Sequence, residues 1–197
     1  MVGADGATHH GVFDLSYLRC VPNMTVMTPA NENETWKMLN TALALGTPAA
    51  VRYPRGGGPG IETVKDDATL TVGKGMVERK GKGLAIMSFG AMLAPALAAA
   101  ENLDATVANM RFVKPLDEEL IIQLAKTHET LATAEENAVM GGAGDAVAEC
   151  LQRHGIHKPL LQLGIGDSFV QHGTPDELLK ECGLDASGVE QRLREWM

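Results

Sequence analysis

The sequence predicts an α/β fold, with a mostly parallel sheet that has helices on both faces, preceded by part of a second α/β domain. Short apolar runs alternate with amphipathic segments of about 10 to 15 residues, the pattern of strands joined by helices in a parallel sheet. A glycine cluster at residues 56–60 interrupts this series and is followed by polar residues. We therefore predict a division into residues 1–58, a linker at 59–72, and residues 73–197.

Residues 1–58 are predicted to contain a strand–helix–strand unit. Residues 1–24 show no sustained period, whereas residues 25–28 and 48–54 have the composition of strands. Asn31 can cap the helix between them, with Glu34 at the spacing of a capping box. The apolar residues of this helix fall on one predicted face: Trp36, Leu39 and Leu43. Such a unit points to parallel strands.

The second part continues the alternation of strands and helices. Strands are predicted at 75–79 (an edge strand), 84–89, 105–110, 130–134 and 160–163. Helices are predicted at 91–103, after Asp117, at 144–154, after Thr174, and at about 187–196. Asp117 and Thr174 are the expected N-caps, and Pro175 and Glu177 complete the second of these caps.

Composition excludes several classes of protein. The 197 residues carry 25 Asp and Glu against 17 Lys and Arg, so no basic surface for nucleic acid or an anionic membrane is expected. No apolar run reaches the roughly 20 residues of a membrane span, and the first residues do not resemble a secretory leader. The three cysteines, Cys20, Cys150 and Cys182, form no disulfide framework. We expect a soluble cytoplasmic protein with reduced thiols.

Two segments carry residues suited to chemistry. Asp5, Thr8, His9 and His10 lie on a glycine-flanked loop, where a carboxylate and imidazoles can transfer protons or hold polar groups of a substrate. Metal ligation by the adjacent histidines is disfavoured, and a plain polar loop is the alternative. Arg52 and Arg55 flank Pro54 at the end of a predicted strand, where ligands bind in open α/β sheets.

Arg55, next to three glycines, can grip a phosphate with two N–H groups; a solvated surface charge is the alternative. Residues 140–144 are glycine-rich and precede a helix, so their amides could bind an anion, although close packing of strand and helix explains them better. Glu135 and Glu136 are candidates for an interface or for a partner of the helix dipole. His172 is expected in a turn rather than in a catalytic site.

Taken together, these segments resemble the 1-deoxy-D-xylulose-5-phosphate synthases. Residues 3–19, Gly-Ala-Asp-Gly-Ala-Thr-His-His-Gly-Val-Phe-Asp-Leu-Ser-Tyr-Leu-Arg, are similar to a signature of that family. Further similar segments follow in the family's order: 27–29, 51–56, 110–117, 135–144 and 173–175. The second half alone is less specific, because transketolases and 2-oxo-acid dehydrogenase β subunits share that domain type.

The resemblance implies the tail of a pyrimidine-binding domain followed by a transketolase C-terminal-like domain. It implies a thiamine-diphosphate- and Mg²⁺-dependent transferase, which condenses pyruvate, with decarboxylation, and D-glyceraldehyde 3-phosphate to 1-deoxy-D-xylulose 5-phosphate. That reaction is the first step of the non-mevalonate isoprenoid route, and its product is also used in thiamine synthesis. His9 and Asp5 would be catalytic, with His9 the group that transfers protons, and Arg55 would bind the substrate phosphate. The resemblance assigns no role to His10, Glu135, Glu136 or His172.

The sequence also departs from the family. It contains no Gly-Asp-Gly triplet, so the metal–diphosphate motif is missing, and the glutamate that activates thiamine would lie upstream. We expect a fragment, inactive alone and binding no cofactor or metal, of a homodimeric enzyme whose remainder is an N-terminal part or a partner subunit. The alternatives are a non-catalytic dimerisation or regulatory module, or a subunit of another transketolase-like or 2-oxo-acid dehydrogenase enzyme.

Overall fold

A small three-stranded sheet joins the two halves of the chain. In the computed structural model, which describes residues 1–197, β1 (Thr25–Met27) and β2 (Ala49–Val51) run parallel and are connected by α2 (Glu32–Leu45). This confirms the predicted strand–helix–strand unit. The third strand, β6 (Phe112–Lys114), was not predicted; it comes from the second half and pairs antiparallel with β1. Both sides of the glycine cluster therefore contribute to one sheet.

The larger sheet has five strands in the order β3-β5-β4-β7-β8. Its strands are β3 (Met76–Arg79), β4 (Leu84–Ser88), β5 (Thr106–Asn109), β7 (Thr130–Ala138) and β8 (Leu160–Ile165). All neighbouring strands are parallel except β3, which lies antiparallel to β5. The position of β3 at the edge of the sheet was predicted. The mostly parallel sheet of the prediction is confirmed.

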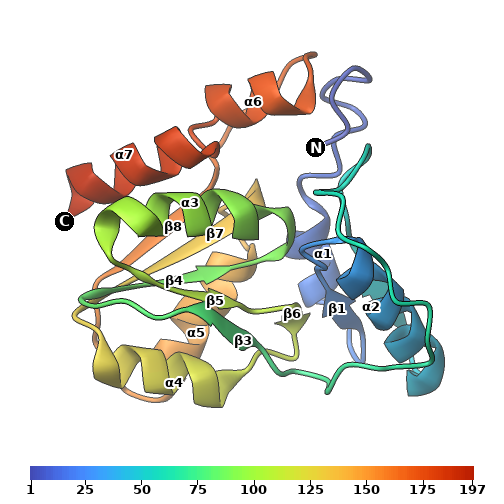
Figure 1. Cartoon of the computed structure of the whole chain (residues 1–197), viewed down its shortest axis with the longest axis horizontal. Helices are drawn as coiled ribbons and strands as arrows, with labels where there is room; N and C mark the ends of the chain where they lie inside the picture. The colour runs from blue at the N-terminus through green and yellow to red at the C-terminus, as the bar shows by residue number, and fades with distance from the viewer.

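Helices cover both faces of this sheet. Figure 1 shows α3 (Leu93–Leu103), after the short η1 (Gly90–Met92), with α7 (Ala186–Trp196) above the sheet, and α4 (Glu118–Thr127) with α5 (Ala143–Arg153) below it. Each face buries its own apolar cluster, and α6 (Pro175–Glu181) packs with the α3 and α7 side through Leu178. No helix combines the length and apolar character needed to cross a bilayer.

The predicted caps of three helices are present. The Asn31 side chain accepts the Glu34 amide at 2.9 Å, and Asp117 accepts the Leu120 amide at 3.1 Å. Thr174 and Glu177 form a full capping box at the start of α6. These side chains satisfy amides that the first helical turn leaves without partners.

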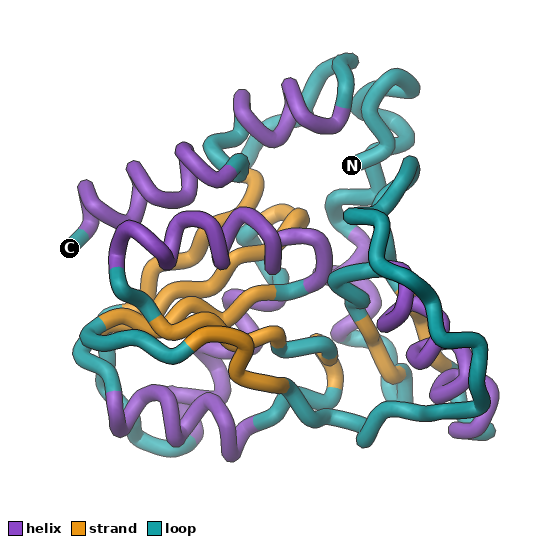
Figure 2. The backbone as a smooth tube through the Cα atoms, in the orientation of Figure 1, coloured by secondary structure: helices purple, strands orange, loops and turns teal.

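The predicted inward face of α2 is wrong. Leu39 and Leu43 are exposed, the latter by 86%, whereas the buried positions of the helix are Glu34, Met38 and Thr41. The helix turns another apolar face inward: Met38 packs with Met27 and Phe112, and Ala42 and Leu45 lie against this cluster. Its Trp36 donates its indole N–H to the Asp66 carbonyl at 2.8 Å, in the long irregular segment between β2 and β3 that is visible in Figure 2.

A short helix, α1 (Asp14–Arg19), was not predicted. Its six residues are too few to show a period, and its N-cap residue, Phe13, forms no capping hydrogen bond with its side chain. It depends on the second half of the chain: the Leu15 amide donates to Asn137 Oδ1 at 3.2 Å, and Arg19 donates to the Gly141 carbonyl at 2.6 Å. Tertiary contacts, which a local pattern does not contain, hold this helix in place.

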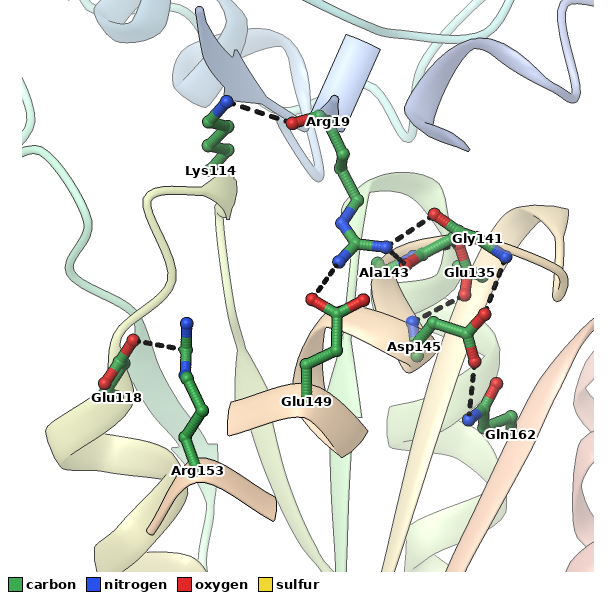
Figure 3. A network of polar contacts seen from close by, with 12 residues as sticks. Arg19, Lys114, Glu118, Glu135, Gly141, Ala143, Asp145, Glu149, Arg153 and Gln162 are labelled. Carbon is green, nitrogen blue, oxygen red and sulfur yellow. Dashed lines mark hydrogen bonds and ion pairs between the residues drawn. The ribbon is translucent and has the colours of Figure 1, made fainter. Parts of the chain in front are cut away.

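Strand β7 runs beyond the predicted residues 130–134 and includes Glu135 and Glu136, both buried. The Glu135 carboxylate accepts the amides of Ala143 and Gly144, each at 2.7 Å, at the start of α5 (Figure 3). Glu135 is thus the partner of the helix dipole. The chain's own carboxylate occupies the amides for which anion binding was the less favoured interpretation, after close packing of strand and helix. Burial raises the pKa of Glu135 to about 7, with Asp145 adding to the effect and the two amides opposing it.

A buried ion pair connects α2 to the turn between β5 and β6. Arg111 Nε donates to Glu34 Oε1 at 2.7 Å, and Asn109 Nδ2 lies 3.0 and 3.1 Å from the two Glu34 oxygens. The Ala30 amide donates to Glu34 Oε2 at 3.0 Å. Arg111 adopts a left-handed φ of 61°, so its backbone is held in an unfavourable conformation while its side chain makes this contact. The pair fixes the two halves relative to each other.

We predict that Arg111→Met lowers the free energy of unfolding by about 3 kcal/mol, because it leaves the Glu34 carboxylate buried without its charged partner. Urea denaturation measures the loss. The control is Arg194→Met, which removes an exposed pair with Glu190 one helical turn away and should leave the midpoint almost unchanged. Equal stability of the Arg111 variant and the wild type would contradict the proposed connection.

A second prediction concerns pH. Because the pKa of Glu135 is raised above its unfolded value of 4.5, the folded state binds the proton more tightly. The contribution of Glu135 to stability is complete below pH 4.5 and declines until about pH 7, by on the order of 3 kcal/mol. Glu135→Gln should remove this slope, which denaturation at pH 5 and pH 8 measures. Parallel pH profiles of variant and wild type would refute the assignment.

Candidate functional site

The loop of residues 3–11 is shaped by two successive turns. The Gly6 amide donates to the Gly3 carbonyl at 3.1 Å, and the His9 amide donates to the Gly6 carbonyl at 3.0 Å. Gly6 has a φ of 74°, a conformation that favours glycine. Asp5 and His9 are exposed, whereas Gly6 and His10 are buried. The loop therefore presents two of the predicted side chains to solvent and anchors itself through the others.

His10 anchors the loop to the far end of the chain. Its Nε2 donates to the Gln171 carbonyl at 2.9 Å, and its Nδ1 accepts the Gly3 amide at 3.4 Å. The carbonyl partner fixes the proton on Nε2. Both ring nitrogens are occupied and the side chain is 3% exposed, so His10 is a structural residue.

The structure brings two of the three predicted site residues into direct contact. Arg55 Nη1 donates to Asp5 Oδ2, although the two residues are 50 positions apart. Both side chains remain accessible, with 62% and 46% of their surface exposed. His9 contacts neither of them; its Nδ1 lies 2.8 Å from the Thr8 hydroxyl. The ring of His9 is therefore free to meet a substrate at the same loop.

The two arginines that flank Pro54 have different surroundings. The Arg52 side chain is 10% exposed and lies 3.3 Å from Asp14 Oδ2 and 3.8 Å from Glu136 Oε2. It joins the end of β2 to β7. Arg52 and the Met1 amino group, which contacts Glu136 Oε1, are the polar partners of the buried Glu136 carboxylate. Arg55 faces solvent, so it is the arginine that can meet a ligand.

A cavity of about 580 Å³ lies beside Arg55. Arg55 and Gly56 contribute one part of its wall, and the segment between β8 and α6 contributes another. Residues from that segment and from α6 are His172, Gly173, Thr174, Pro175 and Glu177. His172 lies in irregular structure, as predicted, but its place in the wall of this cavity was missed. The chain separation of 117 positions from Arg55 (172 − 55) left no local signal for it.

The contact between Asp5 and Arg55 is not surrounded by a set of metal ligands. Among His, Cys, Asp and Glu, the group of three that lies close enough for an ion is Glu118, Cys150 and His154, on helices α4 and α5. There the Arg153 guanidinium donates to Glu118 Oε1 at 2.6 Å (Figure 3). The three cysteines are free, as predicted.

Comparison with known families supports the resemblance seen in the sequence. The model of the transketolase C-terminal domain matches residues 73–189, and that of the transketolase pyrimidine-binding domain matches residues 1–59. Among solved structures, a split-gene transketolase, described as an inactive beta4 tetramer, superposes with a TM-score of 0.85 at 33% identity, over 96% of this chain and 62% of its own. A transketolase variant from Pichia stipitis, at 19% identity and a TM-score of 0.74 over 98% of this chain and 28% of its own, shares the fold.

Curated relatives are more similar in sequence. The 1-deoxy-D-xylulose-5-phosphate synthase of Chromobacterium violaceum is 62% identical over 99% of this chain, and that of Nitrosomonas europaea is 57% identical over 99%. In both cases the match covers 32% of the relative, so the chain spans about a third of the length of these proteins. The resemblance to these synthases is confirmed, and the chain belongs to the transketolase C-terminal domain family.

Proposed function

We propose that the chain is the C-terminal third of a 1-deoxy-D-xylulose-5-phosphate synthase. The reaction is the thiamine-diphosphate-dependent condensation of pyruvate, with loss of CO₂, and D-glyceraldehyde 3-phosphate. The observation that carries this proposal is the contact between Asp5 and Arg55 beside an open cavity, within a chain that is 62% identical to a named synthase. An interaction module would have no need for these exposed, paired groups at a glycine-rich loop.

Each site residue has a role that suits its position. Arg55 offers planar N–H donors at the end of β2, which match the oxygens of the aldehyde's phosphate. Asp5 orients that guanidinium through the ion pair and can accept a hydrogen bond from a substrate hydroxyl. His9, exposed on the same loop, is the group placed to donate or accept a proton.

The residues of this chain do not fit a metal–diphosphate group. The loop that carries Asp5 and His9 offers no cluster of oxygen ligands, and the cluster on α4 and α5 is engaged with Arg153. In our proposal Mg²⁺ and the diphosphate are held by protein outside this chain. The division into 1–58, 59–72 and 73–197 belongs to the same proposal, as do a homodimeric assembly and a cytoplasmic location.

A second candidate is a subunit of an enzyme whose halves are separate chains. It is favoured by one observation: the structurally similar split-gene transketolase, of which this chain covers 62%. In that case the class of reaction is the same, but the part of the enzyme that this chain lacks is supplied by another polypeptide. Sequencing the DNA upstream of Met1, together with the intact mass of the native protein, separates the two arrangements.

We predict that the purified chain binds no thiamine diphosphate by calorimetry, with or without Mg²⁺, and forms no 1-deoxy-D-xylulose 5-phosphate. The reason is that its residues supply no site for the metal and diphosphate. A protein of the relatives' length that contains this chain serves as the positive control. Turnover by the 197-residue chain alone would disprove this view.

In that longer protein, Arg55→Ala should raise the KM for D-glyceraldehyde 3-phosphate by about tenfold to a hundredfold, because charged hydrogen bonds to the phosphate are lost. The KM for pyruvate should change little. Arg55→Lys keeps the charge without the planar pair of donors and should be intermediate. Arg194→Ala is the matched control at an exposed arginine on α7. Equal effects on both substrates would argue against a phosphate role.

A further inference from the structure

The segment of residues 171–175, which leads from the loop after β8 into the first residue of α6, contacts the site loop at three points. The Gln171 carbonyl accepts the buried His10 ring at 2.9 Å. The His172 ring lies directly against Gly6, where an added Cβ would fall within 2.7 Å of three ring atoms. At Gly3 a Cβ would meet the Gly173 carbonyl and Pro175, each at 3.0 Å. Figure 1 shows the N-terminal loop beside the start of α6. This segment of the C-terminal domain is thus part of the site's framework.

His172 has the chemistry of a ligand-binding residue. It is exposed, it lines the cavity of about 580 Å³ together with Arg55, and neither of its ring nitrogens forms a hydrogen bond within the chain. In either neutral tautomer an imidazole offers one N–H donor, and it offers two when protonated. The edge of the ring that carries Nε2 lies against Gly6, so this contact limits the positions that the ring can take before a ligand arrives.

The cavity is lined by one cationic and one anionic side chain, and the cationic one, Arg55, is also paired with Asp5. Arg55 is its one arginine or lysine, and Glu177 is its one carboxylate. Glu177 is occupied by the helix cap: its Oε2 accepts the Thr174 amide at 3.0 Å and the Thr174 hydroxyl at 2.8 Å. These bonds direct the Glu177 carboxylate to the cap, so the side-chain donors left for a ligand are the His172 ring and the part of the Arg55 guanidinium that Asp5 does not engage.

We propose that His172 binds the phosphate of the aldehyde substrate together with Arg55. The C-terminal domain then contributes directly to substrate binding, rather than serving only as a support. This inference rests on the proposed function for the identity of the substrate, while the binding of a phosphate group at His172 can be tested separately. The contact with Gly6 gives His172 a second, positioning effect on the loop that carries Asp5.

The first experiment uses the 197-residue chain and needs no synthase activity. Inorganic phosphate is titrated into the chain while the histidine ring signals are followed by NMR. We expect the His172 signals to shift saturably, and the shift to disappear in Arg55→Ala. The exposed His157, outside the cavity, is the internal control and should not move. A His172 signal that stays constant, or that moves no more than the His157 signal, would overturn the proposal.

The second experiment separates binding from positioning in a protein of the relatives' length. His172→Phe keeps a ring against Gly6 but has no donor, so the KM for D-glyceraldehyde 3-phosphate should rise about tenfold. The KM for pyruvate and for unphosphorylated D-glyceraldehyde should stay within about twofold. His172→Gln restores an N–H donor and should recover part of the loss, and His157→Phe should have no effect.

The outcomes are distinguishable. If the KM for phosphorylated and unphosphorylated aldehydes rises equally in His172→Phe, or if neither changes, phosphate binding by His172 is refuted. If the longer protein makes no 1-deoxy-D-xylulose 5-phosphate at all, the proposed function fails, and the phosphate titration of the chain still decides the role of His172.

Discussion

The pairing of β6 with β1 is the constraint on which the geometry of the site depends. Arg55 follows β2 in the small sheet, whereas His172 follows β8 in the large one. The two residues therefore stay beside the same cavity only if the sheets are fixed to each other. Strand β6 extends from the second half of the chain into the small sheet, and the Glu34–Arg111 pair secures the same junction. A buried ion pair of this kind adds directional specificity even where its net stabilisation is modest.

Buried polar contacts connect the halves at several further places. Arg52 joins the end of β2 to Asp14 and Glu136, and His10 joins the site loop to Gln171. Apolar contacts alone would tolerate small sliding movements, but hydrogen bonds and ion pairs in a low-dielectric interior are lost when the partners shift by about an ångström. The polar junction therefore holds exposed groups such as Asp5 and Arg55 in a defined arrangement.

Features governed by local sequence could be predicted, and features governed by distant contacts could not. The caps at Asn31, Asp117 and Thr174 and the apolar strand β4 follow from short-range rules, and all are present. Helix α1 and strand β6 were missed because six and three residues carry no period and both are held by partners far along the chain. The face of α2 was wrong because Met38, on another face, packs with Met27 of β1 and Phe112 of β6, and the local pattern does not contain these contacts. Asp5, His9 and Arg55 are candidates that the sequence alone offers, but the pairing of Asp5 with Arg55 and the presence of His172 in the adjoining cavity depend on the folded geometry.

The arrangement is also consistent with the proposed phosphate site of this acidic chain. The glycine-rich start of α5 has the amides of an anion site, but Glu135 already occupies them. Arg55 differs, because Asp5 engages only its Nη1 atom and leaves the Nε and Nη2 donors of the guanidinium without a partner. A guanidinium carries five N–H groups in a planar array, so it can bind a phosphate edge while one corner remains paired. The Asp5 carboxylate then sets the orientation of Arg55 without occupying the remaining donors of its guanidinium. Ligand binding at this edge consequently requires no rupture of the ion pair that builds it.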